Sequence, residues 1–151
     1  MKKIIGVFLI IVLAFSMIGC NKNDKNIHQI EIGNTFSKAV RIEVISLGSN
    51  LGEKDQTISV IELDLRVTNI GELPIDTLKD LQIEVNQGEA PLVPIKNTLL
   101  ENSTIEPQHI IESELVIEIR PGQEEEIQIK YKLDGRTKGF TIRIKQPVRI
   151  K

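Results

Sequence analysis

Apolar residues recur at every second position in six separate stretches of the chain, and no other feature of the sequence limits its fold so strongly. A period of two places alternate side chains on opposite faces of a β-strand, whereas a helix repeats its apolar positions every three or four residues. Strands with one apolar and one polar face are typical of antiparallel sheets, because parallel sheets are covered on both faces. The six stretches are residues 40–44, 63–67, 81–85, 115–119, 127–133 and 140–144.

Turn-forming residues separate these stretches. Pro121-Gly122 suits a type II turn, since proline fixes the first φ and glycine accepts a positive second φ. Asp134-Gly135 predicts a hairpin between the last two long strands, with residues 136–138 lengthening its loop. Short strands separated by such turns, without a helical stretch, predict an all-β fold, either a sandwich or a barrel of antiparallel strands.

The N-terminus has the organisation of a secretory signal peptide. Lys2-Lys3 precede an apolar run that begins at Ile4, and the polar chain starts after residue 20. Even extended to Ile18, the run covers fifteen residues, fewer than the roughly 17–25 that a membrane-crossing helix needs. We therefore expect residues 1–19 to be a signal peptide that precedes the domain, rather than a permanent membrane span.

The end of this segment, Met17-Ile18-Gly19-Cys20, resembles the lipobox of bacterial lipoproteins. That resemblance implies transfer of diacylglyceryl to the Cys20 thiol, cleavage between Gly19 and Cys20, and acylation of the new amino terminus by a chain such as palmitate. Two acyl chains hold a protein stably on a membrane, whereas one is marginal. The alternative interpretation makes the lone cysteine a buried thiol or an incidental residue of an ordinary secretory signal.

Processing would divide the chain into three parts. Residues 20–26 are predicted to be the lipidated cysteine and a flexible polar tether, and residues 27–151 the sandwich domain. Cleavage would remove Lys2 and Lys3 and no acidic residue, so the formal charge would change from −2 to −4. An anionic membrane would not attract such a body, which leaves the lipid on Cys20 as the sole membrane attachment.

Two segments of the domain carry a further resemblance. Residues 61–75 are an alternating strand followed by Val67-Thr68-Asn69, Gly71 and Pro74, and residues 119–131 contain a Pro-Gly turn and the penultimate strand. Over about residues 40–145 the chain resembles uncharacterised Firmicute lipoproteins with an immunoprotective-antigen or telokin-like domain. The resemblance implies an all-β fold, an antiparallel two-sheet immunoglobulin-like sandwich, on the extracytoplasmic face of the cell membrane of a Gram-positive bacterium. It implies no catalytic residue.

Composition argues against several classes of function. No stretch concentrates basic residues enough to follow a phosphate backbone, so nucleic acid is not an expected partner. Aromatic residues make up 3% of the chain, which leaves few stacking platforms for sugars or bases. We find no nucleophile motif and no phosphate-binding glycine loop, and acylation would consume the only thiol. We expect no enzymatic activity and no cofactor.

Histidines and carboxylates offer weak candidates for chemistry. His28 and His109 lack zinc-binding spacing and are predicted to be surface residues, so no metal site is expected. Glu62 and Asp64 share a strand face about 7 Å apart, a separation compatible with sugar hydrolysis. Cross-strand pairing explains them without chemistry. The basic partners considered for this pairing are Lys130, Lys132, Arg143 and Lys145.

A run of acidic residues allows a calcium interpretation. Its oxygens would come from residues 124–126 together with Asp76 and Asp80. The same run also suits a charged guard that protects the following strand from aggregation.

The most irregular segment of the domain is the candidate partner loop, Leu92, Val93 and Ile95. Pro91 and Pro94 confine this segment to an edge or a loop. Its three apolar residues either meet a partner or cover one end of the core. We predict a non-enzymatic, lipid-anchored sandwich that contacts an envelope or extracellular protein; the alternative is an extracellular protease-inhibitor-like or calcium-binding module.

Overall fold

The computed structural model describes residues 28–51, 58–101, 104–120 and 126–144. The predicted signal peptide, lipobox and tether lie outside the described residues, as does the Pro121-Gly122 turn. Within the described ranges the chain forms strands and one short 3₁₀ helix, η1 (Thr98–Glu101). This confirms the predicted all-β class.

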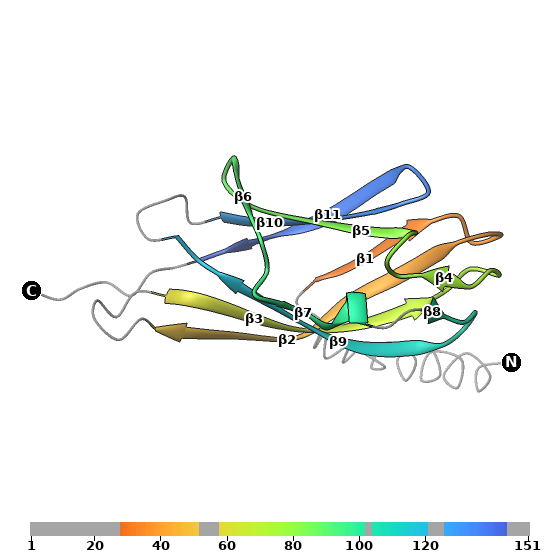
Figure 1. Ribbon diagram of the computed structural model, residues 1–151, viewed down its shortest axis with the longest axis horizontal. Helices are drawn as coiled ribbons and strands as arrows, with labels where there is room; N and C mark the ends of the chain where they lie inside the picture. Colours follow the sequence, from red (N-terminus) through yellow and green to blue (C-terminus); the bar gives the residue numbers. More distant parts are fainter. Residues whose placement is uncertain (1–27, 52–57, 102–103, 121–125, 145–151) are drawn as a thin grey trace, which may run out of the picture.

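The larger sheet contains five antiparallel strands in the order β1-β2-β3-β9-β7 (Figure 1). The chain enters it at the β1 edge and returns to its other edge only after visiting the second sheet. The strands are β1 (Gln29–Gly33), β2 (Ala39–Leu51), β3 (Ile58–Asn69), β9 (Ile110–Glu118) and β7 (Lys96–Asn97).

The smaller sheet packs against the first and has the order β11-β10-β5-β6. A two-stranded ribbon, β4-β8, lies at one end of the sandwich. The strands are β11 (Arg136–Arg143), β10 (Glu126–Leu133), β5 (Leu81–Gln87), β6 (Ala90–Leu92), β4 (Ile75–Asp76) and β8 (Thr104–Ile105).

The core lies between the sheets and follows the predicted alternation. All six alternating stretches fall on long strands, and their core-facing side chains are mostly buried. The predicted antiparallel two-sheet sandwich is therefore confirmed. Tyr131 is fully buried, and burial raises the pKa of its phenol. Within the described residues its hydroxyl has no hydrogen-bond partner, so Tyr131 acts as a packing residue.

The hairpin between β10 and β11 is tighter than predicted. Asp134 (φ 48°) and Gly135 (φ 71°) both have positive φ, as a two-residue type I′ turn requires. The predicted hairpin is confirmed, but the predicted lengthening of its loop is wrong. Residues 136–138 already pair with β10, because the twist of a type I′ turn matches that of the flanking strands.

One edge of the sandwich is made of very short strands. β6 has three residues and β7 has two, and a crossover segment, residues 93–95, joins them. The Gln87 side chain links the sheets nearby, since its amide donates to the Arg120 carbonyl at 3.0 Å and accepts from the Arg120 backbone N–H at 2.9 Å. The Arg120 guanidinium donates to the Pro91 carbonyl at 3.2 Å and so occupies part of the β6 edge.

Candidate binding surfaces

The Asn69 side chain organises the end of the sandwich that carries the β4-β8 ribbon. Asn69 is fully buried at the end of β3. Its amide donates to the carbonyls of Ile105 (2.8 Å) and Leu73 (2.9 Å), and its Oδ1 accepts from the Gly71 N–H (3.0 Å). The Val-Thr-Asn-x-Gly segment, which contributed to the family resemblance, thus has a structural role, because its asparagine holds the neighbouring loops together.

Gly71 allows two loops to approach each other closely. A Cβ atom at this position would lie 2.1 Å from the Ser37 carbonyl oxygen and 2.7 Å from the Ala39 nitrogen, both backbone atoms. The Ser37 oxygen accepts from the N–H groups of Glu72 (2.9 Å) and Leu73 (3.2 Å). The β1–β2 loop and the β3–β4 loop are therefore held together through their backbones.

Phe36 projects from the β1–β2 loop with 80% of its surface exposed. The Asn34 side chain accepts from the Phe36 N–H at 3.1 Å, and the Asn34 carbonyl accepts from the Ser37 N–H at 2.9 Å. This local Asx turn fixes the backbone that carries the aromatic ring. The ring is exposed although its backbone is ordered.

A second Asx turn presents Leu78, which is 63% exposed. Asp76 Oδ1 accepts from the N–H groups of Leu78 (3.0 Å) and Lys79 (3.1 Å). Hydrogen bonding from the Lys79 ammonium lowers the pKa of Asp76. Although burial tends to raise the pKa of Asp80, its ion pair with Lys38 (2.6 Å) leaves that pKa below the ordinary value.

We call Phe36, Leu73 and Leu78 the apical surface. Leu73 is 50% exposed, and its backbone is hydrogen-bonded to the loop that carries Phe36. Lys38 and Asp80 tie the same loop to the Leu78 turn. Three loops thus present large apolar side chains from hydrogen-bonded backbones. Sequence reasoning missed this surface, since each residue is an isolated apolar position outside the alternating stretches.

The calcium interpretation is wrong for the residues that the structure describes. Asp80 adjoins the end of β5 that pairs with Leu133, whereas Glu126 lies at the opposite end of β10. The separation along the strand is about 20 Å. The carboxylates of Asp76 and Asp80 are instead bound to backbone N–H groups and to lysines. Residues 124–125 lie outside the described ranges.

The two histidines do not form a joint site. His28 stacks on Phe140 with ring centroids 5.0 Å apart, beside β1. His109 precedes β9, and its Nδ1 lies 3.1 Å from the Pro107 carbonyl oxygen. β2 and β3 separate the two positions, so the imidazoles are at least roughly 14 Å apart. Within the described residues no group of three or more metal-ligating side chains occurs.

Glu62 and Asp64 lie on the outer face of the larger sheet, as predicted, but three of the predicted basic partners are wrong, and the fourth, Lys145, lies outside the described residues. Lys130, Lys132 and Arg143 belong to the other sheet. The actual partner of Glu62 is Asn50, whose amide donates to the carboxylate at 2.7 Å. Pairing could not be read from the sequence because the alternation does not say which sheet a strand joins.

The crossover segment divides the predicted partner loop. Leu92 is 8% exposed and belongs to the core, whereas Val93 is 87% and Ile95 62% exposed. The Ile95 N–H donates to the Val116 carbonyl at 2.9 Å, which fixes the segment against β9. Leu92 therefore covers the core, and only Val93 and Ile95 stay candidates for partner contact.

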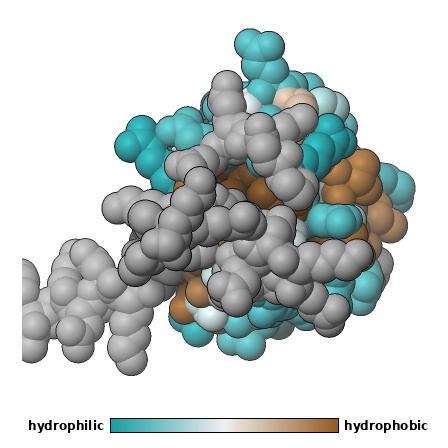
Figure 2. Space-filling model, turned by 90° about the vertical axis from the view of Figure 1, so that its left-hand side faces the viewer, coloured by the Kyte–Doolittle hydropathy of each residue, from teal (hydrophilic) through white to brown (hydrophobic). Residues whose placement is uncertain are grey.

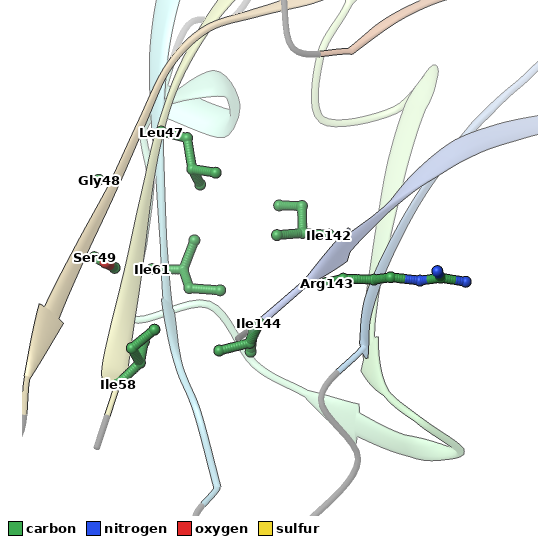
Figure 3. A pocket seen from close by; sticks show the side chains of 8 residues that line it. All are labelled: Leu47, Gly48, Ser49, Ile58, Ile61, Ile142, Arg143 and Ile144. Atoms are coloured by element: carbon green, nitrogen blue, oxygen red, sulfur yellow. The ribbon is translucent and has the colours of Figure 1, made fainter. Parts of the chain in front are cut away.

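An apolar cavity of about 150 Å³ opens between the sheets at the end opposite the apical surface. Figure 2 views the molecule from this end and shows hydrophobic surface in a recess. Leu47, Ile58 and Ile61 of the larger sheet point toward Ile142 and Ile144, and the Arg143 side chain points away (Figure 3). Arg143 pairs with Glu126 instead. Among the described residues that line the cavity, Ser49 is the one polar side chain besides Arg143, so no charged group there is available to orient a ligand.

The described part of the chain contains no helix that is long and apolar enough to cross a membrane.

Comparison with known proteins gives structural neighbours only. No family profile and no curated protein sequence matches the chain. The chain is similar to the archaellum periplasmic stator protein FlaG of Sulfolobus acidocaldarius, with 12% identity over 68% of this chain and 99% of that chain and a TM-score of 0.39. It is also similar to the FlaF–FlaG stator complex of the same organism, with 12% identity over 67% of this chain and 87% of that chain and a TM-score of 0.39. Neither similarity carries an argument about function.

Proposed function

We propose that the chain is a lipid-anchored, non-enzymatic binding module on the extracytoplasmic face of a bacterial cell membrane, and that it binds an envelope or extracellular protein. The lipobox-like sequence before Cys20 supports the anchor and the location. The single observation that supports binding is the apical surface, on which Phe36, Leu73 and Leu78 are half or more exposed.

The backbone hydrogen bonds make this surface suitable for recognition. Association costs conformational entropy when loops and side chains become ordered, so loops that are already fixed lose less on binding. Aromatic and large apolar side chains dominate the energetics of protein interfaces. Exposed charges of both signs adjoin the apical surface, since Glu72 precedes Leu73 and Lys79 follows Leu78, so the apolar side chains are its distinguishing feature.

In-cell photocrosslinking tests the proposal. A photoreactive residue in place of Leu78 is expected to capture a discrete protein on intact cells, and one in place of Gln82, which is exposed on β5, is not. Adding Phe36→Ser to the Leu78 probe should reduce capture about tenfold or more, since anchor residues of interfaces contribute at this level. Thr141→Ser serves as the matched exposed control. Equal capture from positions 78 and 82 would contradict an apical binding site.

A protease-inhibitor-like module is the second candidate, and Val93 is the observation that favours it. A side chain that is 87% exposed in an irregular crossover resembles the presentation of an inhibitory loop. If the chain inhibits an extracellular serine protease, Val93→Asp should weaken inhibition at least a hundredfold, while Leu78→Asp should not. Leu92→Asp is unsuitable for this test because Leu92 lies in the core. Lack of inhibition of trypsin-, chymotrypsin-, elastase- and subtilisin-type proteases would remove this candidate.

A further inference from the structure

Charge is distributed unevenly over the two sheets. On the outer face of the larger sheet the strand register brings together seven carboxylates and three basic residues. The carboxylates are Glu31, Glu43, Glu62, Asp64, Glu112, Glu114 and Glu118, and the basic residues are Arg41, Arg66 and Lys96. The net negative charge of the chain is therefore concentrated on one side of the sandwich.

The β10–β11 hairpin carries the opposite charge. Lys130 and Lys132 lie on the outer face of β10. Arg136 and Lys138 pair with the buried residues Leu133 and Tyr131, so they belong to the other face of the hairpin, where they are exposed along the β11 edge. Within the described residues none of these four side chains forms an ion pair. We call them the basic corner. Glu84 and Asp134 lie nearby and reduce its charge to an excess of about two, since Glu84 faces Lys130 across the strands and Asp134 occupies the turn.

The predicted tether meets the domain at the same corner. His28, the first described residue, stacks on Phe140, which is two positions along β11 from Lys138. Seven residues lie between Cys20 and His28, and the eight steps of chain that join the two positions span at most about 28 Å. A lipid on Cys20 would thus hold the β11 edge close to the membrane.

We propose that the basic corner lies against the anionic phospholipid headgroups of the membrane in which the Cys20 lipid is inserted. This inference rests on the proposed anchor. Each Lys or Arg near an anionic surface strengthens its attraction about fivefold, and the effect is confined to the Debye length. The acidic outer face of the larger sheet is repelled by the same surface, so both faces favour one orientation.

Energy transfer on vesicles tests the orientation. The acylated full-length chain is placed in vesicles of phosphatidylcholine, with or without 30% phosphatidylglycerol, that carry a headgroup-labelled acceptor lipid. After acylation an introduced cysteine is the only thiol, so a donor dye is attached through Thr141→Cys on β11 or through Ser46→Cys on the outer face of β2; both positions are exposed. Because the tether alone would bring position 141 nearer to the membrane, the excess of transfer from position 141 over position 46 is compared between the two kinds of vesicle. This excess should be larger on phosphatidylglycerol vesicles than on pure phosphatidylcholine vesicles, and 0.5 M NaCl should abolish the increase.

A neutralised variant and a matched control assign the effect to the basic corner. Lys130→Gln, Lys132→Gln and Lys138→Gln together should remove the phosphatidylglycerol-dependent increase. Arg41→Gln, Arg66→Gln and Lys79→Gln, which remove equal charge elsewhere, should preserve it. No increase on phosphatidylglycerol vesicles, an increase that 0.5 M NaCl leaves unchanged, or an increase that grows with protein density and so reports a second copy would each overturn the orientation. Failure of the chain to float with pure phosphatidylcholine vesicles would instead contradict the anchor.

Discussion

A chain carrying Cys20→Ala is expected to lose its acyl label completely and to be released from cells into the medium. The label is lost because the thiol is the proposed site of diacylglyceryl transfer. Release follows because the fifteen-residue apolar run is too short for a stable span, and the body, with a net negative charge, has little affinity of its own for the membrane. Metabolic labelling with a palmitate analogue and fractionation of cells and medium measure both effects.

The control for this variant is a serine-to-alanine exchange at Ser16, which leaves the four lipobox-like residues intact. It should be labelled and retained like the parent chain. A Cys20→Ala chain that still incorporates the label would contradict the anchor, and so would a parent chain recovered from the cytosol with residues 1–19 attached.

Asn69→Ala is expected to destabilise the domain by about 3–4 kcal/mol, since it removes three hydrogen bonds of a fully buried side chain and each buried group left unpaired costs about 1–3 kcal/mol. The carbonyls of Leu73 and Ile105 lose their amide donor, and the Gly71 N–H keeps only its longer bond of 3.3 Å to the Ala39 carbonyl. For a domain of this size the midpoint of thermal unfolding should fall by about 10–15 °C. Circular dichroism melting of the purified protein measures the change.

An exposed asparagine provides the matched control. Asn50→Ala removes an amide that donates to Glu62 at the surface. The free energy of unfolding should change by about 0.5 kcal/mol or less, so the melting midpoint should change little. Gly71→Ala is a second test of the same loop junction, because its Cβ would meet the Ser37 and Ala39 backbones. If the Asn69→Ala and Asn50→Ala variants have the same midpoint of thermal unfolding, the Asn69 amide does not stabilise the junction between the loops.

The fold was predictable from the sequence because burial imposes a period of two on strands with one wet face. Leu63, Leu65 and Val67 alternate with polar residues and are buried in β3 as expected. The pairing of strands was not predictable. β9 pairs with β3, and β10 pairs with β5, although these segments are distant in the sequence, and the side-chain alternation contains no information about such pairing.

The candidate binding surfaces were harder to predict from the sequence than the fold. Val93 and Ile95 stood out in the sequence because two prolines interrupt the strand pattern, and both are exposed. Phe36 and Leu78 gave no signal, since an isolated apolar residue in a loop is as often buried as exposed. Their exposure follows from Asx turns at Asn34 and Asp76, and their proximity follows from hydrogen bonds between loops.

The short strands at one edge of the sandwich matter most where copies of the chain are crowded in two dimensions. Molecules confined to a membrane collide edge to edge far more often than the same number free in solution. An exposed strand edge could then recruit its neighbours into a growing sheet. Little backbone is available for such growth at this edge. β6 contains a proline whose carbonyl is bound by Arg120, and β7 has only two residues. The fold is thereby suited to a dense surface layer of separate molecules.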